Sequence, residues 1–587
     1  MPEMFLRTVR ARGGPGVTHE YVRLVESYWE DGRAKQRIIA TLGRKDLLAP
    51  HLGALARILG NEPSSAKRLE PEQVSAQQAA TWGPMLAALT LWRELGLESI
   101  VDGCEGRRRG EKTVPLADRV LALVANRLCD PSSEHALAEW LETDFVCDRR
   151  GRRFVPKWKP QGRVRVDLGW LQHWYRTLDD LLEHKERIEK ELFVRLRDLF
   201  SLQVEMVFYD LTSTYFEGAG PLELARHGYS REGKPRNRQV QVGLVMINGW
   251  PIAHHVFRGN LHDDQTVVAV LEDLERRFGL KRLVFVGDRG MVTRDNLTII
   301  KSRQHGYLLG LKRRRREETS QLIERATGPW IDCPVGITAS EKDEPPRTRV
   351  QEVPSDQPGL RVFVVHSDER LAYEQGMREQ SMERTRGALE QLAQRVAKGK
   401  LKAPEKIGEA AGRILARNHG HRYYAWELRD GAFVFFEHPV HLPREKAFEG
   451  KYVIATEEKD LSPVEAVQAY KELSDVERGF RELKDVIEMR PIYHRKKERV
   501  QAHIFVAALA FLLDRALEKK LKAAGTAVSA AQALKALRTV HVVDIDVGRS
   551  RKRGVTSGST LARQVLSALG ITDREPPKSW ESFQTPT

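Results

Sequence analysis

The alternation of apolar and polar residues predicts an α/β core in the middle of the chain. Residues 203 to 210 alternate with the period of a β-strand. Residues 282 to 288 form a nearly continuous apolar run, which is typical of a strand buried on both faces. Further elements are predicted as strands at 212 to 217, 239 to 248 and 307 to 311, and as a helix at 264 to 278. Strands and helices in this order indicate an α/β fold.

The amino-terminal segments carry other patterns. Residues 1 to 45 alternate around YVRLVESYW and KQRIIATLG, and the turn at Asp31 and Gly32 between these stretches predicts a small β-hairpin module. An α-rich region follows it, with helical spacing at 84 to 97, 115 to 143 and 165 to 198.

The chain changes character again between residues 313 and 457. A Pro-rich polar stretch, EKDEPPRTRVQEVPSDQPG, precedes strand patterns at RVFVVHS, RYYAWEL and AFVFFEH. Long charged helices are predicted at 368 to 397 and 404 to 417, so this part is expected to form an α+β module. Nearer the carboxyl end, helices are predicted between 500 and 540. A basic, loosely ordered segment and a short helix are predicted after about 545.

Composition adds a partner class to this picture. The 587 residues include 96 Lys and Arg against 81 Asp and Glu, which gives a formal charge of +15 and indicates a polyanionic partner. Any one basic cluster is typical of a solvated surface, but several clusters around one acidic centre would form a surface that binds duplex DNA. The clusters are Arg107 to Arg109, PRNRQ at 235 to 239, Lys312 to Arg316, His494 to Arg499 and Arg549 to Arg553.

The cysteines and the apolar runs indicate the compartment. The four cysteines are scattered without the paired spacing of a zinc site or a disulfide framework. No signal peptide opens the chain, and the longest apolar run, Ile504 to Leu513, is too short to span a bilayer. We therefore expect a cytoplasmic, nucleoid-associated protein without a membrane partner.

Two aspartates at the ends of predicted strands are the first candidates for chemistry. Asp210 closes VEMVFYD and Asp288 closes RLVFVGD. An unpaired carboxylate buried in a strand is costly, whereas two carboxylates at the ends of adjacent strands can share metal ions. A single aspartate in this position is more often part of a turn or a helix cap. Glu477, on a predicted helix, adds a third carboxylate and favours a two-metal phosphodiester site.

The helix that carries Glu477 has a regular polar pattern. Tyr470, Glu477 and Lys484 lie seven residues apart, so they are expected to form one stripe along the helix. Such a stripe suits a metal ligand flanked by two phosphate contacts. The alternative is an ordinary solvated helix face.

These residues and their neighbours resemble those of bacterial insertion-sequence transposases of the DDE type. The phrases YDLTSTYFEG, GYSREGKPRNRQVQVGLV, FRGNLHDDQT, VGDRGM and FRELKDVIEMRPIYHRKKERVQAHI look like that family in order and position. The resemblance is to the group with a Tyr-Arg-Glu-Lys (YREK) signature, which Tyr470, Glu477 and Lys484 fit. Leu473 stands where the signature has Arg, so that DNA contact is either absent or supplied by another residue, with Arg478 and Arg481 as candidates.

The resemblance implies a ribonuclease H-like catalytic core interrupted by an α+β insertion domain, with Asp210, Asp288 and Glu477 as catalytic metal ligands. It also implies two Mg²⁺ ions, with Mn²⁺ as a substitute, and double-stranded DNA from the element ends and the target. A homodimer in a synaptic complex is expected, with helices at 500 to 540 as candidate contacts. The DNA-binding candidates are Tyr470, Lys484, Arg478, Arg481, Lys312, Arg313, Arg314, Arg289, Arg236 and Arg238.

The expected function is that of a transposase that binds terminal inverted repeats, cleaves the element ends and joins them to target DNA. Two alternatives stay open: a metal-dependent nuclease without strand transfer, and a catalytically silent, domesticated DNA-binding protein. The expected domains are a hairpin module at 1–50, a helical region at 51–200 that is a candidate for binding the element ends, a core at 201–312 and 458–525, an insertion domain at 313–457 and a helical, basic tail at 526–587.

Three weaker signals remain. GYSREGK at 228 to 234 nearly matches a phosphate-binding loop, but Pro235 replaces the hydroxyl residue that holds magnesium. The adjacent residues His254 and His255 would point to opposite faces of a strand, which disfavours a histidine metal site with His262. Aromatic residues of the insertion domain could stack on an extruded base, although alternating aromatics are more often core. They are Tyr423, Tyr424 and Trp426.

Overall fold

The structure is a computed structural model in which two compact units are distinguished, residues 1–75 with 546–551 and residues 76–545 with 552–587. It describes residues 3–14, 17–30, 33–48, 74–104, 114–155, 159–161, 164–166, 168–200, 206–262, 265–288, 293–311, 317–334, 346–417, 419–547 and 550–577.

The first unit contains a three-stranded antiparallel sheet in the order β1-β2-β3. Its elements are β1 (Glu3–Gly14), β2 (Val17–Glu30), β3 (Arg33–Arg44) and the short helix α1 (Lys45–Leu48). The predicted hairpin is confirmed as β2 and β3, and β1 adds a strand that was not predicted. The expected turn at Asp31 and Gly32 lies outside the described residues.

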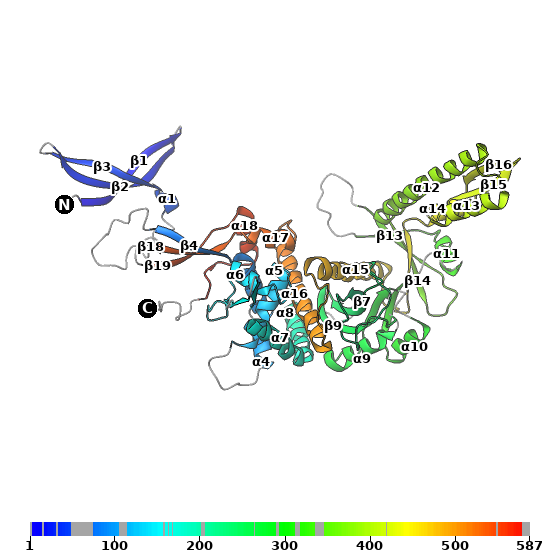
Figure 1. Cartoon of the computed structure of the whole chain (residues 1–587), viewed down its shortest axis with the longest axis horizontal. Coiled ribbons are helices and arrows are strands. Elements are labelled where there is room, and N and C mark those ends of the chain that lie inside the picture. The colour runs from blue at the N-terminus through cyan, green and yellow to red at the C-terminus, as the bar shows by residue number, and fades with distance from the viewer. Residues whose placement is uncertain are drawn as a thin grey trace. The chain divides into compact units, whose positions relative to one another are not determined.

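After strand β4 (Val74–Thr81), the second unit continues with helices, as predicted (Figure 1). They are α3 (Gly83–Glu94), α4 (Leu97–Cys104), α5 (Leu116–Cys129), α6 (Leu137–Thr143), α7 (Leu168–Glu183) and α8 (Lys185–Phe200), with the short strands β5 (Lys159–Gln161) and β6 (Val164–Val166) between α6 and α7. Helix α5 is buried along almost its whole length, because α3, α4, α7 and α16 (Lys497–Ala523) all pack against it.

The second unit also contains a nine-stranded mixed sheet, in the order β12-β13-β14-β17-β11-β10-β7-β8-β9. Strands β7, β10 and β11 are parallel, and the remaining neighbours are antiparallel. The strands are β7 (Met206–Tyr215), β8 (Gln239–Ile247), β9 (Trp250–Arg258), β10 (Val284–Asp288), β11 (Gly306–Leu311), β12 (Ile331–Cys333), β13 (Thr348–Val353), β14 (Arg361–Ser367) and β17 (Lys451–Thr456).

Helices cover both faces of this sheet. Alternate residues of β7, such as Tyr209 and Leu211, share one core with α8, α9 (Val267–Phe278) and α10 (Arg294–Ser302). Phe208 lies in the larger core on the opposite face, with α16 and α15 (Pro463–Arg481). Figure 1 shows α15 on one side of β7 and α9 on the other. The predicted α/β class is therefore confirmed.

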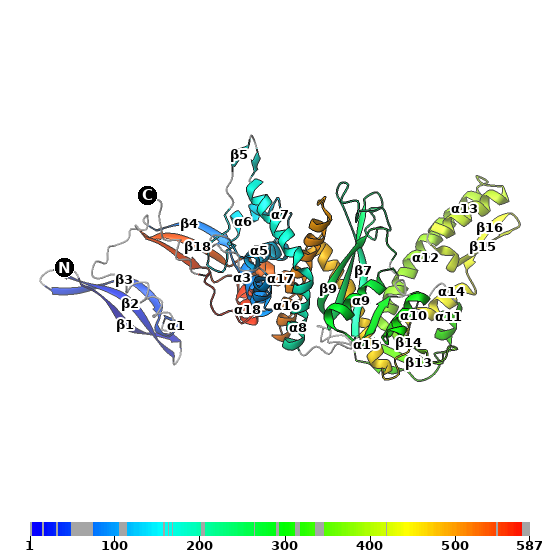
Figure 2. The ribbon, with the colours of Figure 1, turned by 90° about the horizontal axis from the view of Figure 1, so that it is seen from below.

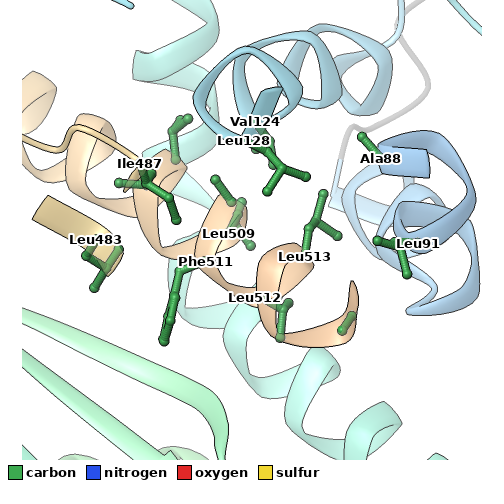
Figure 3. Close-up of a cluster of buried hydrophobic side chains, with 14 of the residues drawn as sticks. Ala88, Leu91, Val124, Leu128, Leu483, Ile487, Leu509, Phe511, Leu512 and Leu513 are labelled. Atoms are coloured by element: carbon green, nitrogen blue, oxygen red, sulfur yellow. The ribbon is translucent and has the colours of Figure 1, made fainter. Parts of the chain in front are cut away.

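Helix α16 joins the helical part to the sheet part. Leu509 and Leu513 lie among side chains of α3 and α5, and Phe511 lies close to Leu483 (Figure 3). By length and composition α16 could cross a membrane, but 89% of its most apolar window is buried inside the structure. This burial is typical of a core helix. It also leaves little of α16 for the dimer contact expected at 500 to 540.

The predicted insertion domain divides into two parts. Strands β12, β13, β14 and β17 extend the nine-stranded sheet, with α11 (Glu317–Glu324) beside them. The rest forms a separate lobe with its own small core, whose elements lie together in Figure 2. The lobe contains α12 (Asp368–Ala397), α13 (Pro404–Arg417), the 3₁₀ turn η5 (Gly420–Arg422), β15 (Tyr424–Arg429), β16 (Ala432–Glu437) and α14 (His441–Phe448).

Three further predictions differ from the structure. The two strands expected at 203 to 217 are one strand, β7, because β-branched Thr212 and Thr214 continue the buried pattern across Asp210. Strand β9 was not predicted. The segment expected to be loosely ordered after 545 instead contributes strands. The carboxyl-terminal elements are α17 (Ala530–Leu537), β18 (His541–Val547), β19 (Ser550–Val555) and α18 (Thr560–Ala568), with β19 and β18 in a sheet with β4 (Val74–Thr81).

Candidate active site

Asp210 and Asp288 occupy equivalent positions along two adjacent parallel strands. The ladder between β7 and β10 pairs Met206 with Val284 and Phe208 with Val286. Each aspartate follows two residues after the last pair, so the two backbones at 210 and 288 lie about one strand spacing apart, roughly 4.8 Å. The placement of the two aspartates on neighbouring strands is therefore as predicted from the sequence. The side chain of Asp288 lies outside the described residues.

Asp210 is held in a half-buried position in the middle of β7. Its backbone pairs with Leu244 of β8, and its Oδ1 accepts a hydrogen bond of 2.8 Å from the N–H of Leu211. Residue 210 has the same strand parity as Phe208, whose side chain belongs to the core beneath α15 and α16. The carboxylate thus belongs to the face of the sheet that α15 covers.

Helix α15 begins at a complete capping box. The hydroxyl of Ser462 accepts from the N–H of Glu465 at 3.2 Å, and the Glu465 carboxylate accepts from the N–H of Ser462 at 2.8 Å. Pro463 occupies the first helical position, where no hydrogen-bond donor is needed. The helix buries one apolar stripe against the sheet, made of Ala466, Val467, Ala469, Leu473, Val476 and Phe480.

Glu477 lies on the exposed side of this stripe, between buried Val476 and exposed Arg478. Leu473 is only 5% exposed and packs in the core. The position where the signature has Arg therefore faces inward in this chain. Arg478 and Arg481 lie on the exposed side, and Arg478 Nε is 3.7 Å from Glu482 Oε1.

Tyr470 lies over the strand next to Asp288. A Cβ added to Gly310 would be 2.0 Å from the Tyr470 Oη, and Gly310 pairs with Asp288 across the ladder between β11 and β10. The ring of Tyr470 also lies 5.7 Å from that of Tyr452, centroid to centroid. Tyr470 is thus half-buried against the sheet, rather than part of a fully exposed stripe.

The predicted stripe of Tyr470, Glu477 and Lys484 is interrupted before Lys484. After Arg481 the helix continues as one π-helical turn, η6 (Glu482–Val486), which alters the angular spacing of the residues. The side chain of Lys484 is 13% exposed, and its Nζ lies 3.1 Å from Glu232 Oε1. Burial lowers the pKa of Lys484, whereas Glu232 opposes this change. Glu232 lies in the GYSREGK phrase, but no local pattern predicted its contact with Lys484, because the two residues are far apart in the chain.

The remaining DNA-binding candidates fall into two groups. Arg236 is exposed in the loop between β7 and β8, and Arg238 donates a 3.0 Å hydrogen bond to the Ala219 carbonyl. Arg289, Lys312, Arg313 and Arg314 lie outside the described residues.

Two other groups of possible metal ligands occur among the described residues. Glu482, Asp514 and Glu518 bring carboxylate oxygens within 4.8 Å of one another. Burial, together with Glu482 and Glu518, raises the pKa of Asp514 to about 7, against Arg515. Arg515 lies 2.9 Å from Glu482 and 2.7 Å from Glu518, so its guanidinium already pairs with the two other carboxylates of this group.

The second group joins Glu134, His494 and His503. It lines a cavity of about 580 Å³. Arg127 Nη2 lies 3.3 Å from His503 Nδ1 and 3.6 Å from Glu134, so a cation is already present. Burial works against the charged form of Glu134, but hydrogen bonds with the two histidines hold its pKa well below the ordinary value. This group therefore resembles a buried ion-pair network more than a metal site.

Residues of the weaker sequence signals make contacts within the protein that explain their positions. His254 Nδ1 lies 2.9 Å from Glu189, and His255 Nε2 lies 3.5 Å from Asp273, so these histidines contact different carboxylates. Tyr423 and Tyr424 are buried in the core of the lobe, where they cannot stack on an extruded base.

More than half of the chain is similar to a known protein family. Residues 206–513 match a family model described as "Transposase DDE domain". Residues 6–68 match a model described as "IS1634 family transposase, N-terminal domain". A search of curated proteins finds no match.

Proposed function

Because the chain belongs to the DDE transposase family, we propose that it binds the terminal inverted repeats of its insertion sequence, cleaves the DNA there and joins the freed ends to target DNA. Family membership makes it an insertion-sequence transposase, a DNA-binding enzyme of nucleotidyl transfer. The family typically uses divalent metal ions. The observation that carries the finer proposal is the level placement of Asp210 and Asp288 beneath the helix of Glu477.

The strand order supports a ribonuclease H-like core. In that fold three consecutive antiparallel strands are followed by two strands parallel to the first. Here β7, β8 and β9 are consecutive and antiparallel, and β10 and β11 join β7 in parallel, in the order β9-β8-β7-β10-β11. We regard the lobe of α12 to α14 as the insertion placed before the acidic helix.

The path of α15 supports a common site for the three acids. Midway along the helix, Lys471 Nζ lies 2.7 Å from the Thr348 hydroxyl of β13, and Tyr470 lies over β11. The helix also packs on β10 and β7. From Tyr470 to Glu477 it advances about 10 Å, which is close to the width of two strand spacings. Glu477 is therefore expected to reach the level of β7 and Asp210.

The donor set suits magnesium or manganese. Asp210, Asp288 and Glu477 offer only carboxylate oxygens, which hard divalent ions prefer. When bound, two such ions would activate water and stabilise the leaving oxygen of a phosphodiester. The protein contributes the positions of its ligands: the paired strands fix the backbones of two aspartates, and the core packing of Leu473, Val476 and Phe480 fixes the helix that carries the third acid.

Basic residues near this site are suited to hold DNA. The loop between β7 and β8 carries Arg231, Lys234 and Arg236 at the surface, and Arg478 and Arg481 are exposed on α15. Phosphate contacts of this kind position a duplex without reading its sequence. Two element ends must be brought together for joining, so we propose a homodimer in the synaptic complex, whose contacts lie elsewhere than on buried α16.

The test is a cleavage and joining assay on labelled linear DNA that carries the gene's own flanking ends, with a supercoiled target plasmid and Mg²⁺. We expect cleavage at the ends and joined products from the wild type, and neither from Glu477→Gln, which should still bind the ends. Cleavage without joined products would indicate a nuclease, and binding without cleavage a silent DNA-binding protein. Full cleavage by Glu477→Gln would reject the assignment of Glu477.

A further inference from the structure

A buried carboxylate links the loop after β7 to the turn that ends the acidic helix. The side chain of Glu232 is 5% exposed, and its two oxygens contact different cations. Oε1 lies 3.1 Å from Lys484 Nζ, and Oε2 accepts a 2.6 Å hydrogen bond from Arg490 Nη1. Arg490 also pairs with Asp485.

The loop that presents Glu232 is fixed to β7 beside Asp210. The N–H of Arg231 donates to the Ser213 hydroxyl at 3.1 Å, and the Arg231 guanidinium donates to the carbonyl of Leu211, the residue after Asp210. The base of the loop has no spare room, because a Cβ on Gly228 would lie 2.0 Å from the Gly259 carbonyl oxygen. Glu232 is thus attached rigidly to the strand of the first catalytic aspartate.

The other partners of Glu232 belong to the segment that follows Glu477. Lys484 lies in the π-helical turn, and Arg490 follows it shortly before Ile492. Ile492 returns to the same strand, since its N–H donates to the Tyr215 carbonyl at 3.1 Å and its carbonyl accepts from Glu217 N–H at 3.0 Å. Glu232 therefore connects two segments, the loop after β7 and the segment after α15, and both segments are hydrogen-bonded to β7.

A buried Glu–Lys pair is a poor means of gaining stability. Removing both charges from water costs about as much as their attraction returns, so apolar residues of the same size often serve as well. The pair is better explained by a requirement for two cations at fixed positions. We propose that Glu232 is a positioning residue that orients Lys484 and Arg490 toward the phosphates of the scissile DNA strand. This inference rests on the proposed function.

The variant that tests this role is Glu232→Gln, which keeps the shape of the side chain and removes its charge. Glu223→Gln is the matched control, because Glu223 is exposed and precedes the same loop. Cleavage is measured in single turnover at saturating protein, and DNA binding by anisotropy without metal. We expect Glu232→Gln to cleave roughly ten- to a hundredfold more slowly, as displaced catalytic groups do, with DNA affinity reduced much less. Glu223→Gln should match the wild type.

Two further readouts separate positioning from a general loss of folding. The Lys484→Ala and Glu232→Gln losses should not multiply in the double variant, because both act through one ammonium group. The pH profile of the cleavage rate should also change. Without Glu232, burial, Arg231 and Arg490 all lower the pKa of Lys484. The decline of the cleavage rate at alkaline pH should therefore begin at a lower pH. Asp485, which pairs with Arg490, is another acid near Lys484 in the chain. The profile does not depend on how much of the protein is folded.

Wild-type cleavage by Glu232→Gln, multiplying losses in the double variant, or an unchanged pH profile would each overturn the role of Glu232. The proposed function is tested separately by Glu477→Gln. If that variant cleaves normally, the site assignment fails whatever Glu232→Gln does.

Discussion

The hydroxyl of Tyr470 lies directly over Gly310, the residue that pairs with Asp288 across the parallel ladder. The absence of a side chain at 310 allows α15 to lie close to the sheet at this point. The distance between the acidic helix and the aspartate strands is therefore set in part by one glycine.

Gly310→Ala should displace Tyr470 and with it α15. The new Cβ would lie 2.0 Å from the Tyr470 Oη, so the ring must move. We expect a loss of about 1–3 kcal/mol in the free energy of unfolding, as for other overpacked sites, together with slower DNA cleavage. Urea unfolding and the cleavage assay measure the two effects. The double variant Gly310→Ala, Tyr470→Ala should avoid the clash, and an equal strain penalty in that variant would contradict this explanation.

Gly479→Ala tests the contact between α15 and α16. Gly479 follows Glu477 by two residues, and a Cβ at 479 would lie 2.7 Å from the ring of buried Phe511. The helix propensity of Ala favours the change, but the clash should outweigh it and give a net loss of about 1–2 kcal/mol. The control is Gly376→Ala in α12, where nothing lies within 4 Å of the added Cβ. That variant should gain about 0.5–1 kcal/mol in the same urea titration.

Asp514→Asn should stabilise the protein at neutral and alkaline pH. Burial, helped by Glu482 and Glu518, raises the pKa of Asp514 from 3.8 to about 7. The folded state therefore favours the protonated acid. The wild type loses stability as the pH rises from about 4 to 7, on the order of 1.4 kcal/mol per pH unit, and Asn does not titrate. Urea unfolding at pH 4.5 and pH 8 should show an advantage of the variant that grows with pH. Asp460→Asn, at an exposed site, should show no such trend.

Arg149→Ala should weaken the helical part of the second unit. The Arg149 Nε donates to both oxygens of Asp118 at 3.1 and 3.0 Å, and its Nη2 donates to Asp102 at 3.0 Å. The side chain of Asp118 is 5% exposed, so loss of its partner leaves a buried acid uncompensated, at a cost of about 3 kcal/mol. Thermal melting compares this variant with Arg150→Ala, whose side chain is exposed. Equal melting temperatures for the two variants would argue against the ion-pair explanation.

Local sequence patterns predicted the elements but not their long-range contacts. Helices α12 and α13 have the predicted bounds, and the bounds of strands β10 and β11 differ from the predicted ones by at most two residues. The hydrophobic period and the residues that end each element are local features of the sequence. Asp210 and Asp288 lie on adjacent strands as predicted, but Asp210 lies in the middle of β7 rather than at its end, because the buried pattern continues through Thr212 and Thr214. The pairing of Glu232 with Lys484 was not predicted, since it depends on how a loop folds back across the sheet. The π-helical turn was also missed, because no residue pattern marks it.

The division of the large hydrophobic core along the chain has a consequence for synthesis. Phe208 and Val286 of the sheet are made early, whereas α15 and α16, which cover the same face, are made last among the elements of that core layer. While the ribosome translates the lobe of α12 to α14, one side of β7 and β10 remains open to water. Nascent chains should therefore need a holding chaperone during this interval, and translation that stops before α16 should give insoluble fragments.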